Sequence, residues 1–271
     1  TKTVALRGTG LAPQLTQLPA ASETIDLGTV ETGFGTSSRR ELTIREGQLE
    51  LGKAKITLNG AFAWPEDGYR VDLNAELAKA ACQDVLAAVP RGLLDDLAAI
   101  QLSGTFGGKL LVHVDAANLD ATKVDFDIQD KCKFGVLPAM LDLGRFQRPF
   151  AHQVLEPDGT VFEMETGPGT PNWTPIEYVS PFFIQAVIAH EDGRFFGHHG
   201  FAEPEIGVAL SRNLKAKAFK FGASTITMQL VKNVFLRRDK LLARKVQEAL
   251  IVWWLEQHWD KRRILELYLN V

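Results

Sequence analysis

The sequence has no apolar run that approaches the roughly 18 residues a membrane-spanning helix needs. Its longest apolar stretch, around residues 250–255, is short and is flanked by charged residues. It lacks the features of a secretory signal peptide, and it begins with Thr1 instead of methionine. We therefore expect the chain to be an internal piece of a longer protein, with any membrane anchor outside it.

Cysteine is also scarce. The two cysteines, Cys82 and Cys132, have a spacing that fits no metal-binding pattern. Two interpretations stay open at this stage. The cysteines form a disulfide in an oxidising compartment, or they are two separate buried thiols.

The composition is otherwise that of an ordinary globular protein. With 45% hydrophobic and 23% charged residues over 271 positions, it excludes wholesale disorder and predicts about two domains. The charge is uneven, because residues 1–170 hold 16 Lys and Arg against 23 Asp and Glu, whereas residues 171–271 hold 14 against 10. The basic half indicates an anionic partner, and phosphate, an anionic membrane surface and nucleic acid all fit this charge.

Residues 40 to about 130 alternate apolar and polar side chains, which predicts an antiparallel sheet with one wet face. Two alternating segments flank Glu46 and Gly47 and predict a hairpin there. Further strands are predicted at residues 56–58, 69–73, 110–114 and 124–128.

Two helices are predicted as an insertion in this sheet, at residues 76–89 and 91–100, with a break at Pro90. We find no catalytic constellation in residues 1–145 and interpret them as a β-rich accessory domain. On pattern alone, this part resembles the β-rich repeats of AsmA-like envelope proteins, which form lipid-handling grooves.

Residues 145–175 hold eight Pro and Gly residues, which is typical of a linker, so we place a linker at residues 146–174. From Ser180 the apolar period becomes helical, with Ser180 as a predicted N-cap and Pro181 in the first turn. Five helices are expected: one from Pro181, one at residues 204–218, one from Ser224-Thr225 to about Phe235, one at 240–259, and one at 260–270 capped by Asp260. In the first helix, the residues expected to be buried are Phe182, Phe183, Ala186, Val187 and Ala189.

Four segments in this helical half combine carboxylates, hydroxyls and cations in a fixed order. They are Glu191-Asp192-Gly193-Arg194-Phe195-Phe196-Gly197-His198-His199-Gly200, Gly222-Ala223-Ser224-Thr225-Ile226-Thr227-Met228-Gln229, Arg244-Lys245-Val246-Gln247-Glu248, and Lys261-Arg262-Arg263-Ile264-Leu265-Glu266-Leu267-Tyr268-Leu269-Asn270.

These segments resemble the first four motifs of the glycosyltransferase family 51 domain, which occurs in class A penicillin-binding proteins and monofunctional transglycosylases. The family patterns are Glu-Asp-x-x-Phe-x-x-His-x-Gly, Gly-x-Ser-Thr-x-Thr-x-Gln, Arg-Lys-x-x-Glu and Lys-x-x-Ile-Leu-Glu-x-Tyr-x-Asn. Ala223 and Met228 stand where the family usually has glycine and glutamine. The resemblance covers about residues 175–271, and the family's fifth motif is absent from the sequence, so we expect the domain to be truncated after the fourth motif.

The resemblance implies a peptidoglycan glycosyltransferase that polymerises lipid II into glycan strands and releases undecaprenyl pyrophosphate. The implied fold is α+β, with the β-rich domain followed by an all-α, lysozyme-like transglycosylase lobe that is incomplete here. The implied partners are lipid II, the growing glycan strand, a membrane surface and other cell-wall synthesis proteins, without nucleic acid. The implied location is the bacterial cell envelope, at the periplasmic face of the inner membrane.

The resemblance makes Glu191 and Glu248 the catalytic candidates. As the general base, Glu191 would take the proton of the attacking sugar hydroxyl, and its position at an apolar helix end is expected to raise its pKa by desolvation. The residues predicted to bind the substrate are Asp192, Ser224, Thr225, Gln229, Lys232, Arg244 and Lys245. Among them, Lys232, Arg244 and Lys245 would stabilise the departing pyrophosphate.

Glu248 shares one helical face with Arg244 and Lys245. It could orient these cations or hold a divalent ion such as Mg²⁺ over the pyrophosphate, and no cofactor is certain. His198 and Phe195 are expected to be structural, as are Glu266 and Tyr268. Two readings stay open for Trp253, Trp254 and Trp259, namely a membrane-facing aromatic group and core packing.

Two other functions compete with glycosyl transfer. One is a non-catalytic envelope module that binds lipid or glycan and carries a transferase remnant, which the intact Glu191 and Glu248 disfavour. The other is a lysozyme-like hydrolase, which the cations disfavour because a hydrolase holds no pyrophosphate.

Overall fold

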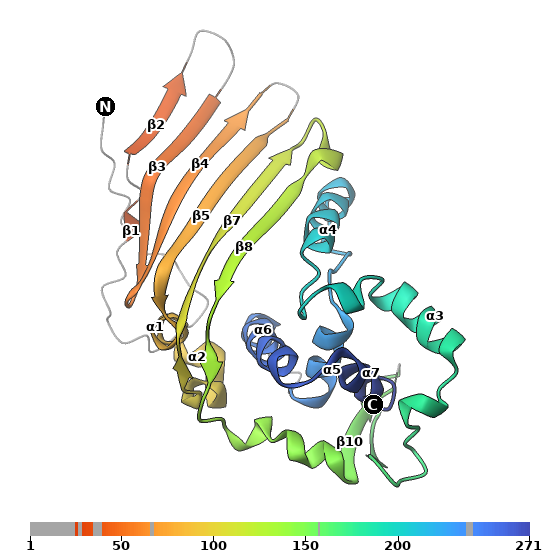
Figure 1. The fold of residues 1–271 in the computed structure, drawn as a ribbon. Coiled ribbons are helices and arrows are strands. Elements are labelled where there is room, and N and C mark those ends of the chain that lie inside the picture. Colours follow the sequence, from red (N-terminus) through yellow and green to blue (C-terminus); the bar gives the residue numbers. More distant parts are fainter. Residues whose placement is uncertain (1–24, 27–28, 35–39, 66–67, 157, 237–240) are drawn as a thin grey trace. The chain divides into compact units, whose positions relative to one another are not determined.

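The computed structural model describes residues 25–26, 29–34, 40–65, 68–156, 158–236 and 241–271 (Figure 1). Most strands lie in the N-terminal half of the sequence and most helices in the C-terminal half, which confirms the predicted α+β class. The chain divides into two compact bodies, each of which is described by itself. We call them the sheet body, residues 1–91, 101–135 and 203–223, and the helical body, residues 92–100, 136–202 and 224–271.

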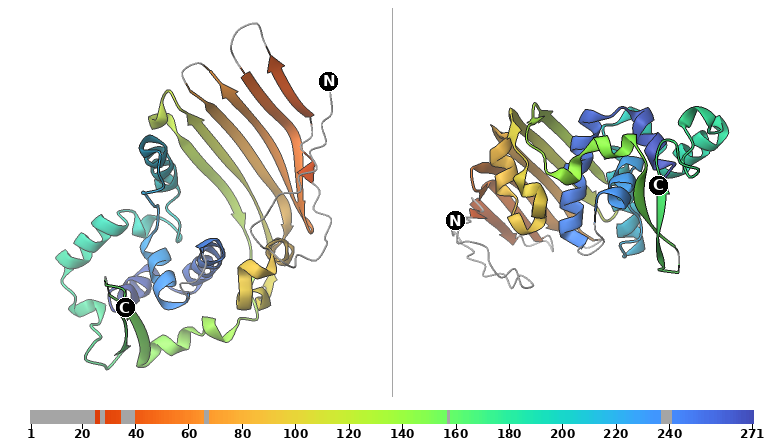
Figure 2. Two further views of the ribbon diagram at one scale, coloured as in Figure 1. Left: turned by 180° about the vertical axis from the view of Figure 1, so that it is seen from behind. Right: turned by 90° about the horizontal axis from the view of Figure 1, so that it is seen from below.

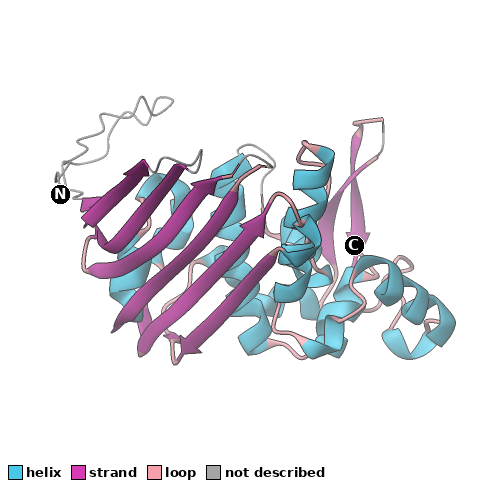
Figure 3. Ribbon diagram, turned by 90° about the horizontal axis from the view of Figure 1, so that it is seen from above, coloured by secondary structure: helices cyan, strands magenta, loops and turns pink. Residues whose placement is uncertain are grey.

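In the sheet body, the described residues form a seven-stranded antiparallel sheet, whose strands lie side by side in Figure 3. Its order is β1-β3-β4-β5-β7-β8, and β2 also pairs with β3. The strands are β1 (Ile25–Asp26), β2 (Thr29–Phe34), β3 (Arg40–Leu51), β4 (Ala54–Trp64), β5 (Arg70–Ala81), β7 (Thr105–Asp115) and β8 (Lys123–Asp130). A short ladder joins β6 (Leu102–Ser103) to β9 (Lys133–Phe134).

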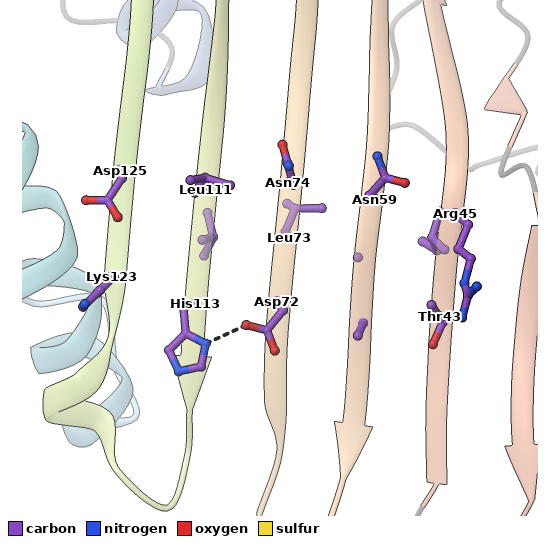
Figure 4. A pocket seen from close by; sticks show the side chains of 14 residues that line it. Thr43, Arg45, Asn59, Asp72, Leu73, Asn74, Leu111, His113, Lys123 and Asp125 are labelled. Atoms are coloured by element: carbon purple, nitrogen blue, oxygen red, sulfur yellow. Dashed lines mark hydrogen bonds and ion pairs between the residues drawn. The ribbon is translucent and has the colours of Figure 1, made fainter.

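The register places polar side chains together on one face of this sheet, as the alternation predicted. Asp72, on β5, pairs with His113 on β7, and His113 pairs with Lys123 on β8. Figure 4 shows this face, where His113 Nδ1 lies 2.6 Å from Asp72 Oδ1 and a shallow hollow opens over the strands.

The predicted hairpin at Glu46 and Gly47 is wrong. Strand β3 runs through both residues, and the register with β4 shifts between Ile44 and Gly47. Glu46 has a left-handed φ of 54°, and its N–H donates to Asn59 Oδ1 at 2.9 Å. The residues therefore form a β-bulge, which uses the same local chemistry as a turn. The chain turns at Gly52 instead, where φ is 59°.

The predicted helix at residues 76–89 is partly wrong, because β5 continues to Ala81 and pairs there with Thr105 of β7. Cross-strand hydrogen bonds outweigh the helix propensity of this alanine-rich stretch. Helix α1 (Cys82–Ala88) follows, and beyond Pro90 come α2 (Arg91–Leu94) and the 3-10 helix η1 (Asp95–Ala99).

The structure decides between the two interpretations of the cysteines, because Cys82 and Cys132 form a disulfide. Their Cα atoms are 5.8 Å apart, within the usual range for such a bond. The disulfide ties the first residue of α1 to the segment that follows β8.

Helix α4 (Glu203–Ala216) lies against β8 in the sheet body. Gly207, a buried residue of this helix, approaches the β8 backbone so closely that an added Cβ would lie 3.4 Å from Val124 N. Ser211 Oγ donates to Leu119 O at 2.6 Å, and Lys215 pairs with Asp120.

The helical body contains the other predicted helices (Figure 2). They are α3 (Pro181–Glu191), α5 (Ile226–Val234), α6 (Leu241–His258) and α7 (Lys261–Tyr268). The segment predicted as a linker contains a two-stranded hairpin of β10 (Phe150–Leu155) and β11 (Val161–Thr166). No helix among the described residues is long and apolar enough to span a membrane.

The core of the helical body is formed by α5, α6 and α7, with Leu230, Trp254 and Ile264 fully buried. Phe146, which precedes the hairpin, is also fully buried and stacks edge-on against Phe235. The core interpretation of Trp254 is therefore confirmed.

Helix α3 contradicts the prediction that its apolar residues are buried. None of its residues is buried, and the Phe182 side chain is 83% exposed. An apolar sequence cannot specify whether its neighbour is a protein core or a binding partner.

Candidate active site

The second motif begins at the N-terminus of α5. Thr225, not Ser224, caps this helix, since Thr225 Oγ1 accepts from Met228 N at 3.2 Å. The same hydroxyl donates to Gly200 O at 2.7 Å, which joins the second motif to the end of the first. Ser224 is exposed, whereas Thr225 is fully buried, so Ser224 is the residue of this pair that is accessible to a substrate.

Asp192 connects the same two motifs. Its carboxylate lies 3.0 Å from His198 Nε2 and accepts from Ile226 N, the first amide of α5, at 3.1 Å. Its side chain is only 3% exposed, so these bonds give Asp192 a structural role, and its binding of substrate stays a prediction.

His198 has the structural role that was predicted. Its Nδ1 accepts from Gly200 N at 3.1 Å, which leaves the proton on Nε2 to be donated to Asp192. Gly200 has a φ of 87°, and an added Cβ would lie 3.1 Å from Glu256 Cγ on α6. Both the left-handed backbone and this close approach explain glycine here.

Glu191 is the last residue of α3. Its Oε2 accepts from Gln229 Nε2 at 2.8 Å, and its Oε1 lies 2.9 Å from His190 Nδ1. Gln229 in turn accepts from the Tyr268 hydroxyl at 3.2 Å. The first, second and fourth motifs therefore meet at the Glu191 carboxylate.

The predicted rise in the pKa of Glu191 is wrong. The hydrogen bond from Gln229, followed by that from His190, holds the pKa of Glu191 below its ordinary value. Desolvation opposes this shift but is small, because the Glu191 side chain is 34% exposed. Burial, followed by the negative charge of Glu191, raises the pKa of Tyr268.

The predicted cations are distributed over α5 and α6, which pack against each other. Lys232 lies three residues after Gln229, and hence on the same face of α5. Lys245 Nζ donates to Glu248 Oε1 at 2.7 Å. Among the described residues, no hydrogen bond or ion pair joins Glu191 to Lys232 or Arg244.

Two buried charged atoms in the third motif have no hydrogen-bond partner among the described residues. They are Arg244 Nε and Glu248 Oε2. The Glu248 side chain is 1% exposed, and an unpaired polar atom this deep is uncommon. Both atoms mark the start of α6 as a polar site within an apolar core.

Sequence reasoning overlooked Glu256. This buried carboxylate accepts from Thr227 Oγ1 at 2.5 Å and from Lys261 Nζ at 2.8 Å, so it connects the second motif to the fourth. Lys261 also lies 4.5 Å from the centre of the Phe195 ring. Glu256 follows Glu248 by eight residues, close to two helical turns, and this period was the available signal.

The described part of the chain contains no group of three or more His, Cys, Asp or Glu residues that could hold a metal ion. The Glu248 carboxylate alone provides oxygen ligands at the third motif. This donor set does not form a metal site without oxygens from a substrate, so no step below is assigned to a metal.

Glu191 ends α3, and hydrogen bonds keep its carboxylate ionised. Helices α5 and α6 carry the predicted cations Lys232, Arg244 and Lys245. A carboxylate kept ionised in this way can accept a proton as a general base, and neighbouring cations can stabilise negative charge on a leaving group.

The comparison with protein families agrees with this chemistry. Residues 158–271 match the family model described as Transglycosylase, and this part of the chain is a transglycosylase domain of glycosyltransferase family 51. The match begins inside the segment that was predicted to be a linker, and it includes α4, which lies in the sheet body.

Several curated proteins called biosynthetic peptidoglycan transglycosylase are similar to this chain. One from Nitrosospira multiformis is 50% identical over 99 residues, which cover 36% of this chain and 43% of that protein. One from Nitrosomonas eutropha is 50% identical over 99 residues, covering 36% and 41%. One from Acinetobacter baylyi is 46% identical over 98 residues, covering 36% and 44%. The chain thus spans less than half the length of these relatives.

Proposed function

We propose that this chain is part of a peptidoglycan glycosyltransferase that polymerises lipid II and releases undecaprenyl pyrophosphate. The observation that carries the proposal is the hydrogen bond from Gln229 to the Glu191 carboxylate. Gln229 stands three residues before Lys232, so both residues share one face of α5. A base for the acceptor and a cation for the leaving group thereby belong to one site. The similar proteins named biosynthetic peptidoglycan transglycosylase support the substrate class.

Glu191 is the proposed base. The 4-hydroxyl of an incoming lipid II attacks the anomeric carbon of the glycan held on undecaprenyl pyrophosphate, and the hydroxyl proton passes to Glu191. A carboxylate kept ionised by two hydrogen bonds is ready to accept it at neutral pH. One displacement forms the new glycosidic bond, breaks the bond to the pyrophosphate, and inverts the anomeric centre.

The leaving pyrophosphate needs positive charge and no proton. Lys232, Arg244 and Lys245 are the proposed source, with Ser224 adding a hydroxyl at the exposed start of α5. Glu248 would keep Lys245 oriented through their 2.7 Å bond, and its second oxygen is buried without a hydrogen-bond partner among the described residues.

A membrane surface is the proposed neighbour, since the carrier of the substrate is a lipid. In the sheet body, Phe219 is 99% exposed and stands between Lys217 and Lys220. In the helical body, Tyr178 and Phe182 are 82% and 83% exposed. Exposed aromatic side chains beside lysines suit the interface of an anionic bilayer, which supports an envelope location.

The test is polymerisation of lipid II by the full-length protein and by its Glu191→Gln variant. The amide keeps the shape and the bond to Gln229 but cannot accept a proton, so we expect a loss of about 10²-fold or more in rate. Glu177→Gln is the matched control, because Glu177 is an exposed glutamate of the same body paired with Arg262. Unimpaired polymerisation by Glu191→Gln would refute the base assignment.

A further inference from the structure

Residues 92–100 come from the β-rich half of the sequence but belong to the helical body. This segment includes η1 and ends at Ile100. Leu97 and Ile100 are each 1% exposed, and Leu94 is 3% exposed. Three buried apolar side chains within seven residues make the segment a component of a folded core.

The segment also reaches the third motif. Asp95 Oδ2 accepts a hydrogen bond from Gln247 Nε2 of α6 at 3.0 Å. Gln247 directly precedes Glu248 and follows Lys245 by two residues. This exposed hydrogen bond joins Asp95 to the turn of α6 that carries Lys245 and Glu248.

Asp95 adopts an uncommon backbone to make this contact. Its φ is 49°, in the left-handed region, where aspartate and asparagine are tolerated better than most residues. This left-handed residue is the first of η1, directly after α2, and its carboxylate accepts from Gln247.

The C-terminal half of the sequence likewise contributes a segment to the sheet body. Residues 203–223 lie within the segment that matches the transglycosylase family, yet they belong to the sheet body through the packing of α4 on β8. Each body therefore contains a piece of the other half of the sequence, so neither half is a separate module.

We propose that Asp95 is a positioning residue for catalysis, supplied by the N-terminal half to fix the α6 turn that holds Lys245 and Glu248. The roles of these two residues rest on the proposed function. Residues 92–100 thereby make the N-terminal half a part of the catalytic architecture.

Three substitutions separate the hydrogen bond from the backbone conformation. Asp95→Asn keeps an acceptor oxygen and tolerates the left-handed region, whereas Asp95→Gly fits the backbone but has no acceptor. Asp95→Ala has neither property. Asp96→Ala, at the exposed neighbouring position in η1, controls for the loss of one negative charge.

The first readout is amide hydrogen exchange of residues 244–248 in the full chain. Loss of one hydrogen bond should speed exchange there roughly fivefold in Asp95→Gly and at least as much in Asp95→Ala. Asp95→Asn and Asp96→Ala should match the unsubstituted protein. Equal exchange in all variants, or an Asp95→Asn variant that exchanges as fast as Asp95→Ala, would show that the Asp95–Gln247 hydrogen bond does not restrain the α6 turn.

The second readout is lipid II polymerisation by the full-length protein, where Asp95→Gly should lower kcat by a similar factor and leave KM nearly unchanged. Gln247→Ala should have the same effect, and the double variant should add little to it. Faster exchange with an unchanged kcat would show that the hydrogen bond restrains the α6 turn without positioning residues for catalysis, and this would overturn the proposal. If the full-length unsubstituted protein does not polymerise lipid II, the proposed function is wrong. The hydrogen-exchange result does not depend on that activity and tests the Asp95–Gln247 bond separately.

Discussion

Gln229 Nε2 donates to Glu191 Oε2 across 2.8 Å, and this bond joins the last residue of α3 to the middle of α5. The amide orients the carboxylate and stabilises its charge at once. Because the Tyr268 hydroxyl donates to the Gln229 oxygen, the amide can present only its N–H to Glu191.

This bond predicts a shift in the pH dependence of the reaction. The pKa of Glu191 is lowered, so the base should stay ionised at lower pH than an ordinary glutamate, and activity should fall only as pH drops through this lowered pKa. Gln229→Ala removes the larger cause, so the acidic limb of kcat/KM should move to higher pH. His190→Ala should move it by less. Gln185→Ala, at an exposed position of α3, should leave the limb in place, and an unmoved limb in Gln229→Ala would contradict the assignment.

Lys232 is predicted to bind the pyrophosphate. Titration with farnesyl pyrophosphate, a short isoprenyl pyrophosphate, should give a Kd about tenfold higher for Lys232→Ala, as expected for one charge-assisted hydrogen bond. Added salt should narrow this difference. Lys53→Ala, which removes an exposed lysine of the sheet body, is the control, and equal affinity in both variants would rule out this role.

Gly200 is predicted to contribute to the stability of the helical body. Gly200→Ala would place a methyl group against α6 at a φ of 87°, so unfolding free energy should fall by about 1–3 kcal/mol. Gly193→Ala is the matched control, because nothing lies within 4 Å of its added Cβ. Chemical denaturation of both variants tests this, and equal midpoints would show that the site tolerates a side chain.

The disulfide is predicted to stabilise the sheet body. It closes a loop over a sequence separation of 50, so its loss should lower stability by about 2–4 kcal/mol. Thermal unfolding with and without a thiol reductant measures this effect. The reductant should lower the Tm of the unsubstituted protein and leave a variant with both Cys82→Ser and Cys132→Ser unchanged.

Much of the helical half was predictable because its signals are local. A cap such as Asp260 acts on an amide three residues away, and Asp260 Oδ1 accepts from Arg263 N at 2.8 Å as expected. The order of the four motifs was equally readable, since it is a property of the chain alone. The same holds for Thr225, whose capping role depends on its own helix.

Two of the failures involve partners that are distant in the chain. Residues 76–81 form a strand because β7 offers cross-strand hydrogen bonds, and nothing within that stretch reports the presence of β7. The pKa of Glu191 fell because Gln229, 38 residues away, donates to it, and sequence reasoning had assumed burial alone.

The sequence by itself determined the class of the C-terminal half, its helices, and the residues that bring charge to the site. Only the tertiary structure decided which of those residues stay accessible to solvent: Asp192 and Thr225 are buried and join α5 to the first motif, and Glu191 remains partly exposed. It also decided that residues 92–100 complete the helical body. The physical reason is the same in each case, since hydrogen bonds and burial between segments far apart in the chain are set by packing and leave no local pattern.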